Sequence, residues 1–209
     1  MQNLAISKTR FIGYFIAALV LFQPVELFSQ KRTDSNKSYS VNSSHKNGKS
    51  TIHVTDNGND YKIEYKGEIT LSADDKDITA ISDGGYIEIE RSSFGSRRRI
   101  VIDADRNGNL ERSYYVGRSE KNYEPEGREW LAEILIDVVR STTIGAESRV
   151  QRFYAKGGAN AVLSEIRQMD SDYVESRYFS LLLENNLSDS ELVSTIEMAG
   201  KRIKGNYIS

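Results

Sequence analysis

The chain has 209 residues, of which 38% are hydrophobic and 28% are charged, and its formal net charge is −2. This composition supplies enough apolar side chains for a folded core, and it lacks the basic bias of a nucleic-acid-binding protein. The chain contains no cysteine, which excludes disulfides, thiolate metal sites, cysteine nucleophiles and a lipid anchor on cysteine. Its two histidines are His45 and His53.

Residues 1–30 are expected to form a secretory signal peptide. Two basic residues and no acidic residue precede the apolar run Phe11–Phe22, which is followed by Pro24. This order is typical of an export signal, and the run is short for a membrane span, which needs about 20 residues. A cut after Ser29 would place Leu27 where a small residue is usual, so an uncleaved anchor in the inner membrane stays an alternative, and a buried core helix is a third. The first two readings place the bulk of the chain in the periplasm or the extracellular space.

Residues 31–50 are expected to form a flexible linker. They are polar, rich in Ser, Asn and Lys, and show no hydrophobic periodicity. His45 falls in this segment and has no second ligand nearby. We therefore interpret it as a solvated side chain and not as a metal ligand.

Residues 51–120 are expected to form an antiparallel β-meander of about six strands. Apolar residues alternate with polar ones along this region, as at Ile52 and Val54. The turns between the runs are rich in Gly, Asn and Asp and fall at residues 57–58, 82–85, 94–96 and 106–109. Short strands with such turns favour hairpins over βαβ units.

Residues 121–209 are expected to contain about five helices with helical-hairpin character. Gly157 and Gly158 are predicted to separate the second helix from the third. The first helix is marked by apolar residues at helical spacing, namely Trp130, Leu131, Ile134, Leu135, Val138 and Val139. Together the two regions give an α+β fold, and the short link at 118–125 allows residues 51–209 to pack as one unit.

The last helix has the clearest start signal. Residues 188–191 read Ser-Asp-Ser-Glu, which predicts a capping box. In this helix we expect Leu192, Ile196 and Ala199 to face inward.

A 34-residue repeat is suggested by two helix ends. Tyr173 and Tyr207 lie 34 residues apart, and each follows a helix end with a small or polar pair before it. This spacing is typical of helical-hairpin arrays of the tetratricopeptide kind, which build interaction surfaces. A chance similarity between two helix–helix loops is the alternative.

Three segments of the β region, 76–90, 97–102 and 111–115, resemble a region found in bacterial envelope proteins. It is similar to the segment downstream of the peptidase domain in some BlaR-type membrane-bound regulatory zinc peptidases. The helical residues agree with it, so that the resemblance covers about residues 60–207. Those peptidases bind zinc through a His-Glu-x-x-His helix, which this sequence lacks. The resemblance therefore implies an accessory envelope segment and no peptidase activity.

Asp103, Asp105 and Asn107, followed by Gly108, look like the start of a calcium loop. The bidentate glutamate is missing, however, because position 12 of such a loop falls on Tyr114. Asn-Gly between two strands is the ordinary signal of a hairpin turn. We interpret the motif as a turn, so that no metal and no cofactor is predicted for the chain.

The acidic residues Asp74, Asp75 and Asp77 raise the alternative of a carboxylate-dependent envelope enzyme, which would pair two of them, or one with Asp103 or Asp105, in a cleft. A solvated turn is the preferred interpretation, because nothing in the flanking sequence places them in a pocket.

The chain contains 12 tyrosines, and exposed tyrosines favour binding surfaces. Tyr115, Tyr173 and Tyr178 form the candidate interaction surface, with helix packing as the alternative role of Tyr173 and Tyr178. We therefore expect a non-catalytic exported module that binds another envelope protein, for interaction or sensing. A carboxylate-dependent enzyme and a small-ligand-binding protein that uses the sheet face are the alternatives.

Overall fold

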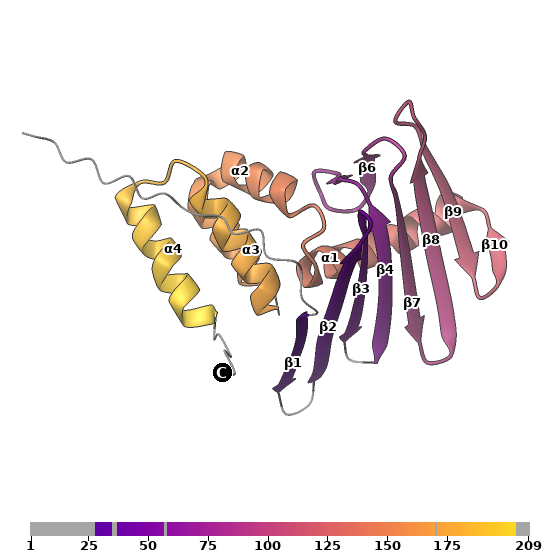
Figure 1. Cartoon of the computed structure of the whole chain (residues 1–209), viewed down its shortest axis with the longest axis horizontal. Helices are drawn as coiled ribbons and strands as arrows, with labels where there is room; N and C mark the ends of the chain where they lie inside the picture. Colours follow the sequence, from indigo (N-terminus) through magenta and orange to yellow (C-terminus); the bar gives the residue numbers. More distant parts are fainter. Residues whose placement is uncertain (1–27, 35–36, 57, 170, 204–209) are drawn as a thin grey trace, which may run out of the picture.

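A computed structural model describes residues 28–34, 37–56, 58–169 and 171–203. Within these ranges the chain forms ten strands, a π-helical turn and four α-helices (Figure 1). The eight-stranded sheet is antiparallel throughout and has the order β1-β2-β3-β4-β7-β8-β9-β10, and β5 pairs with β6 in a separate sheet.

The elements have the following bounds. The strands are β1 (Phe28–Asp34), β2 (Lys37–Lys46), β3 (Lys49–Asp56), β4 (Asn59–Lys66), β5 (Ile69–Leu71), β6 (Ile78–Ile81), β7 (Tyr86–Ser93), β8 (Ser96–Ala104), β9 (Leu110–Val116) and β10 (Ser119–Lys121). The helical elements are η1 (Tyr123–Gly127), α1 (Arg128–Ser141), α2 (Ala146–Ile166), α3 (Asp172–Leu183) and α4 (Asp189–Arg202).

The expected α+β class is confirmed, whereas the expected counts of six strands and five helices differ from the structure. The second and third expected helices are joined in α2. The predicted break is nevertheless present inside it, because Gly157 and Gly158 have non-helical backbone angles, with a φ of 63° at Gly158. A φ of this sign is open to glycine at little cost, so the chain bends there without ending the helix.

The expected linker at residues 31–50 is wrong over residues 31–34, which belong to β1, and over residues 37–50, which belong to β2, to the β2–β3 turn and to the start of β3. A strand needs backbone partners more than apolar side chains. In β2, Val41 alone is a buried apolar residue among those whose side chains are described, and the backbone pairs with β3. Residues 1–27 of the expected signal peptide lie outside the described residues, and its last three residues, 28–30, begin β1. Tyr207 of the suggested repeat also lies outside the described residues. No helix in the described ranges is both long and apolar enough to cross a membrane.

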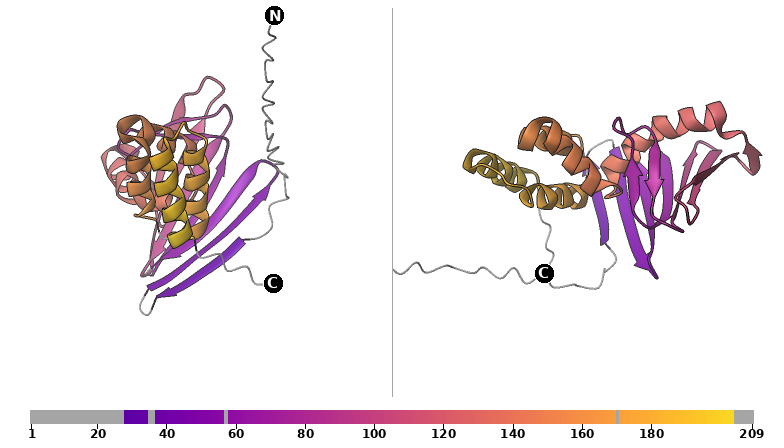
Figure 2. Two further views of the ribbon diagram at one scale, coloured as in Figure 1. Left: turned by 90° about the vertical axis from the view of Figure 1, so that its left-hand side faces the viewer. Right: turned by 90° about the horizontal axis from the view of Figure 1, so that it is seen from above.

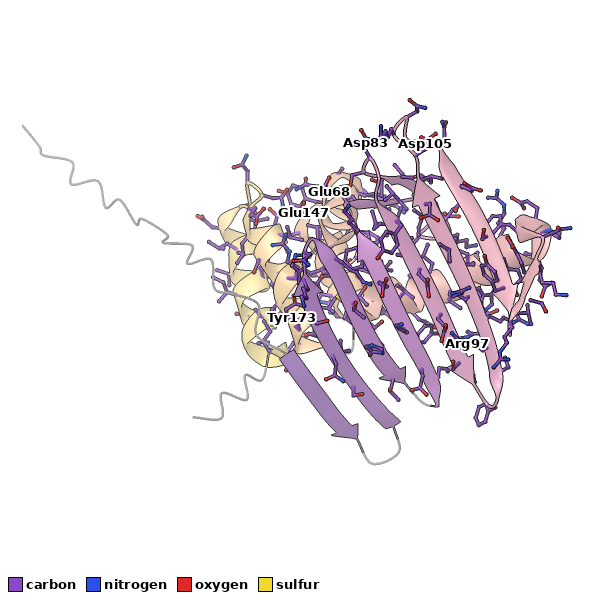
Figure 3. The ribbon with its side chains drawn as sticks, turned by 45° about the vertical axis from the view of Figure 1, so that its right-hand side comes forward. Glu68, Asp83, Arg97, Asp105, Glu147 and Tyr173 are labelled. Carbon is purple, nitrogen blue, oxygen red and sulfur yellow. The ribbon has the colours of Figure 1, made fainter. Side chains whose placement is uncertain are left out.

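The first hydrophobic core lies between the sheet and α1, which crosses one face of the sheet (Figure 1). Alternate residues of β4, β7 and β8 point into it, among them Ile63, Ile89 and Ile100, which are fully buried. The predicted apolar residues of α1, from Trp130 to Val139, are all buried against them. The opposite face of the sheet carries polar side chains, and no described helix covers it (Figure 3).

The second hydrophobic core lies among α2, α3 and α4, which stack beside one end of the sheet (Figure 2). Val150, Val162, Val174 and Leu182 are fully buried there. This core shares no residue with the first. The molecule therefore consists of a sheet region and a helical region, each with apolar packing of its own.

Candidate functional site

A buried ionic junction connects the two regions. Arg149 of α2 has no exposed surface, and its guanidinium contacts Asp75 of the β5–β6 turn at 3.0 Å and Glu165 at 2.8 Å. It also donates a hydrogen bond to the hydroxyl of Tyr178. Arg152 binds the other oxygen of Asp75 at 2.5 Å. Charges buried in this way need partners on every side, so the junction fixes the helical region against the sheet region.

The protonation states in the junction follow from these contacts. Burial alone would raise the pKa of Glu165, but hydrogen bonds from Arg140 and Arg149 outweigh it and lower the pKa below its ordinary value. Burial raises the pKa of Tyr178. At neutral pH Glu165 is therefore ionised and the hydroxyl of Tyr178 keeps its proton.

Helix α4 is anchored to the helical region at both of its ends. The predicted capping box is present, because Ser188 accepts a hydrogen bond from the backbone of Glu191 and Glu191 accepts one from the backbone of Ser188. Glu191 also accepts from the amide of Ala159 in α2 at 3.3 Å. At the other end Arg202 binds the buried Glu175 of α3 with two nitrogen–oxygen contacts, of 3.0 and 2.5 Å. Helix α4 is thus a fixed element and not a frayed end.

The inward side of α4 differs from the prediction. Ala199 does lie against the helical core, as expected, but Leu192 and Ile196 keep 39% and 58% of their surface exposed. The only α4 residue classed as buried is Thr195. The contacts of Glu191 with Ala159 and of Arg202 with Glu175 orient the helix so that Glu191, Thr195 and Arg202 face the stack. Leu192 and Ile196 each lie one position further along, about 100° around the helix, and are directed away from the stack.

We call Leu192, Val193, Ile196 and Gly200 the apolar flank of α4. Val193 is 55% exposed. The four residues follow the spacing i, i+1, i+4 and i+8, so they share one side of the helix. A methyl group added at Gly200 would meet no atom of the described residues within 4 Å, so packing among these residues does not require a glycine there. Such a surface can accept a second helix at close approach.

The three tyrosines of the predicted interaction surface do not lie together. Tyr178 is fully buried in the ionic junction, so its inclusion in a surface was wrong and its packing role is correct. Tyr115 lies on the open face of the sheet, where the guanidinium of Arg99 is 4.3 Å from its ring. Tyr173 is 46% exposed and lies on the helical region, far from the sheet ends marked by Arg97 and Asp105 (Figure 3).

The calcium-loop look-alike forms a hairpin turn between β8 and β9. Asp105 accepts hydrogen bonds from the backbone of Asn107 at 2.7 Å and of Asn109 at 2.8 Å, and from the amide side chain of Asn109 at 2.9 Å. These bonds lower the pKa of Asp105. A carboxylate that accepts from the backbone two residues on gives the hydrogen bonding of an ordinary turn.

The acidic cluster is divided among separate roles. Asp74 accepts a hydrogen bond from the hydroxyl of Ser72 at 2.7 Å. Asp75 belongs to the ionic junction, and Asp77 lies 3.1 Å from Arg128. Asp103 and Asp105 lie at the end of β8 and in the turn that follows it. Within the described ranges no three His, Cys, Asp or Glu residues gather as a metal site would require.

Sequence reasoning missed the apolar flank because helical periodicity shows that a stripe exists but not whether it is covered. The one available signal was Gly200 inside a helix beside that stripe. No protein-family model, no curated protein and no solved structure matches the chain, so these comparisons do not link it to the BlaR-type peptidases.

Proposed function

We propose that the chain is a non-catalytic exported module, and that it binds an envelope protein through the apolar flank of α4. The observation that carries this proposal is the exposure of Leu192, Val193 and Ile196 on a helix that is fixed at both ends. Single exposed apolar side chains are common, but a group at helical spacing is typical of a helix that packs against another helix. The helical-hairpin character expected from the sequence supports the same reading.

The occupant that fits best is one amphipathic helix of a partner protein. The three exposed apolar side chains of the flank supply only part of the about 800 Å² that a stable interface buries on each partner. Any occupant of this flank must therefore also contact the surface around it. A single helix added to the α2–α3–α4 stack would extend packing that already exists, and Gly200 would let its backbone come close.

The test is site-specific photo-crosslinking of the full chain in intact cells. A photoreactive residue at Glu197, which borders the apolar flank, is combined with the natural sequence or with Ile196→Asp. The control position is Phe94, which is 97% exposed on the β7–β8 hairpin and lies far from α4. We expect one product at Glu197 that maps to an amphipathic helix of another protein and is lost with Ile196→Asp.

Other products would contradict the proposal. A product with the mass of two chains would identify a second copy as the occupant. A peptide of the same chain would show that the flank is covered internally. The same product at Phe94, or no product at Glu197, would show that the flank binds nothing specifically.

The alternative of a carboxylate-dependent enzyme stays a hypothesis. It requires two carboxylates that face one cleft, and the contacts of Asp75 and Asp77 with arginines lend it no support.

A further inference from the structure

The register of the large sheet places three lysines side by side. Lys46 of β2 lies directly opposite Lys49 of β3, and Lys49 lies directly opposite Lys66 of β4. Residues paired in this way direct their side chains to the same face, which here is the open face of the sheet. Tyr86 of β7 lies opposite Lys66 and continues the row. We call Lys46, Lys49 and Lys66 the lysine row.

The lysine row is expected to reduce the stability of the sheet. Like charges directly opposite one another in a sheet repel. Lys49 is compensated, because its ammonium lies 2.6 Å from Glu64, which raises the pKa of Lys49 and lowers that of Glu64. Among the described residues, Lys46 and Lys66 have no such acidic partner. Two uncompensated ammonium groups therefore remain about 10 Å apart at their strand positions.

A hollow of about 510 Å³ lies over the lysine row. Its walls carry the three ammonium groups and the hydroxyl-bearing residues Ser44, Thr51 and Tyr86, and no acidic residue lines it. The hydroxyl of Tyr86 donates to Glu64 at 2.9 Å, and the same carboxylate oxygen lies 2.6 Å from the ammonium of Lys49. The hollow thus presents many hydrogen-bond donors and a positive charge.

We propose that the lysine row binds a ligand with several closely spaced phosphate groups, beyond the partner binding assigned to α4. The hollow is larger than a single small anion needs, and its two uncompensated charges are spread over three strands, which favours a multivalent anion. Lysine acts as a mobile point charge, so it suits phosphate groups without demanding one fixed geometry. The phosphates can belong to a soluble molecule or to the headgroups of an anionic lipid surface.

The test compares two probes and two lysine variants on residues 28–209, after the circular dichroism of this portion has been shown to match that of the full chain. The probes are inorganic tripolyphosphate, followed by calorimetry, and vesicles of phosphatidylglycerol against vesicles of phosphatidylcholine, followed by sedimentation. The double variant Lys46→Gln/Lys66→Gln removes the uncompensated charges. The control Lys62→Gln removes a charge from the same face of the same strand, β4.

We expect the double variant to weaken binding by about tenfold or more and to raise the melting temperature, because it removes repulsion together with the ligand contacts. Lys62→Gln should leave binding within about twofold. Binding of tripolyphosphate and of anionic vesicles identifies the phosphate group as the ligand, and binding of vesicles alone identifies a lipid surface. Failure of both probes at low salt, or equal losses in Lys62→Gln and the double variant, would overturn the proposal.

Discussion

The exposed surfaces of the sheet region and of the helical region differ in whether their side chains have partners within the chain. The open face of the sheet has no helix over it, yet its side chains pair locally, as between Arg97 and Glu90 and between Arg99 and Glu88. The helical region leaves Val193 and Ile196 on a fixed helix with no comparable compensation. Exposure alone therefore says little about binding. The informative surfaces are those whose charged side chains lack an opposite charge or whose apolar side chains lack packing partners. The apolar flank is such a surface in the helical region, and the lysine row is its counterpart in the sheet region.

The largest expected effect comes from separating the two regions. Arg149→Met removes the buried cation and leaves Asp75 and Glu165 facing each other, which should cost about 3–5 kcal/mol of unfolding free energy. Urea unfolding would be followed by the fluorescence of Trp130, the only tryptophan, and by helical circular dichroism. We expect the two signals to coincide in the natural chain and to separate in the variant.

A matched control is Arg177→Met, which breaks a pair with Glu147 whose side chains are 41% and 64% exposed. It should cost less than about 1 kcal/mol. Equal losses in both variants would mean that the junction is no stronger than a surface ion pair.

Acid should weaken the same junction. The folded-state pKa of Glu165 lies below the ordinary value of 4.5 for a glutamate. The contribution of Glu165 to the unfolding free energy is therefore complete above that pH and is lost as pH falls through the folded-state pKa. The loss should be about 1.5–3 kcal/mol, as for a hydrogen bond to a charged group. Unfolding free energies of the natural chain and of Glu165→Gln, measured from about pH 7 to about pH 3, should converge at the acid end. Parallel curves would contradict this assignment.

Loss of the cap should loosen α4 alone. Ser188→Ala removes the side chain that accepts from Glu191 and should cost about 1 kcal/mol. Hydrogen exchange should increase over residues 189–199 and stay unchanged in the sheet region. Ser188→Asp should restore protection, because aspartate also caps a helix; if it does not, the cap is not what fixes this helix.

The smallest expected effect has the opposite sign. Gly200→Ala should raise the unfolding free energy by about 0.5–1 kcal/mol, because glycine inside a helix is unfavourable and the added methyl meets open space. Gly200→Phe should leave the fold intact and abolish the crosslink at Glu197. A destabilised alanine variant would show that the glycine serves the monomer and not a partner.

Much of the fold could be predicted because alternation and helical spacing are local signals. The period of two gave the strands from Ile52 onward, and the stripe from Trp130 to Val139 gave the buried face of α1. Strand β2 could not be predicted, since its polar residues are held by backbone pairing with β3. The two proposed binding surfaces could not be predicted from the sequence for a related reason. The lysine row can be recognised only from the register of the strands, which places the three lysines opposite one another. The exposure of Ile196 depends on how Arg202 and Glu191 orient the helix.

The ionic junction also bears on the order in which the chain folds. Hairpins and neighbouring helices join residues close in sequence, whereas Arg149 and Arg152 reach Asp75 across 74 and 77 positions. Closing loops of this length is entropically costly, so we expect these contacts to form after both cores have begun to assemble. Substitution of Arg149 should then speed unfolding far more than it slows folding. The junction would then form late in folding. It would determine how slowly the two regions separate and would have little effect on how quickly each one folds.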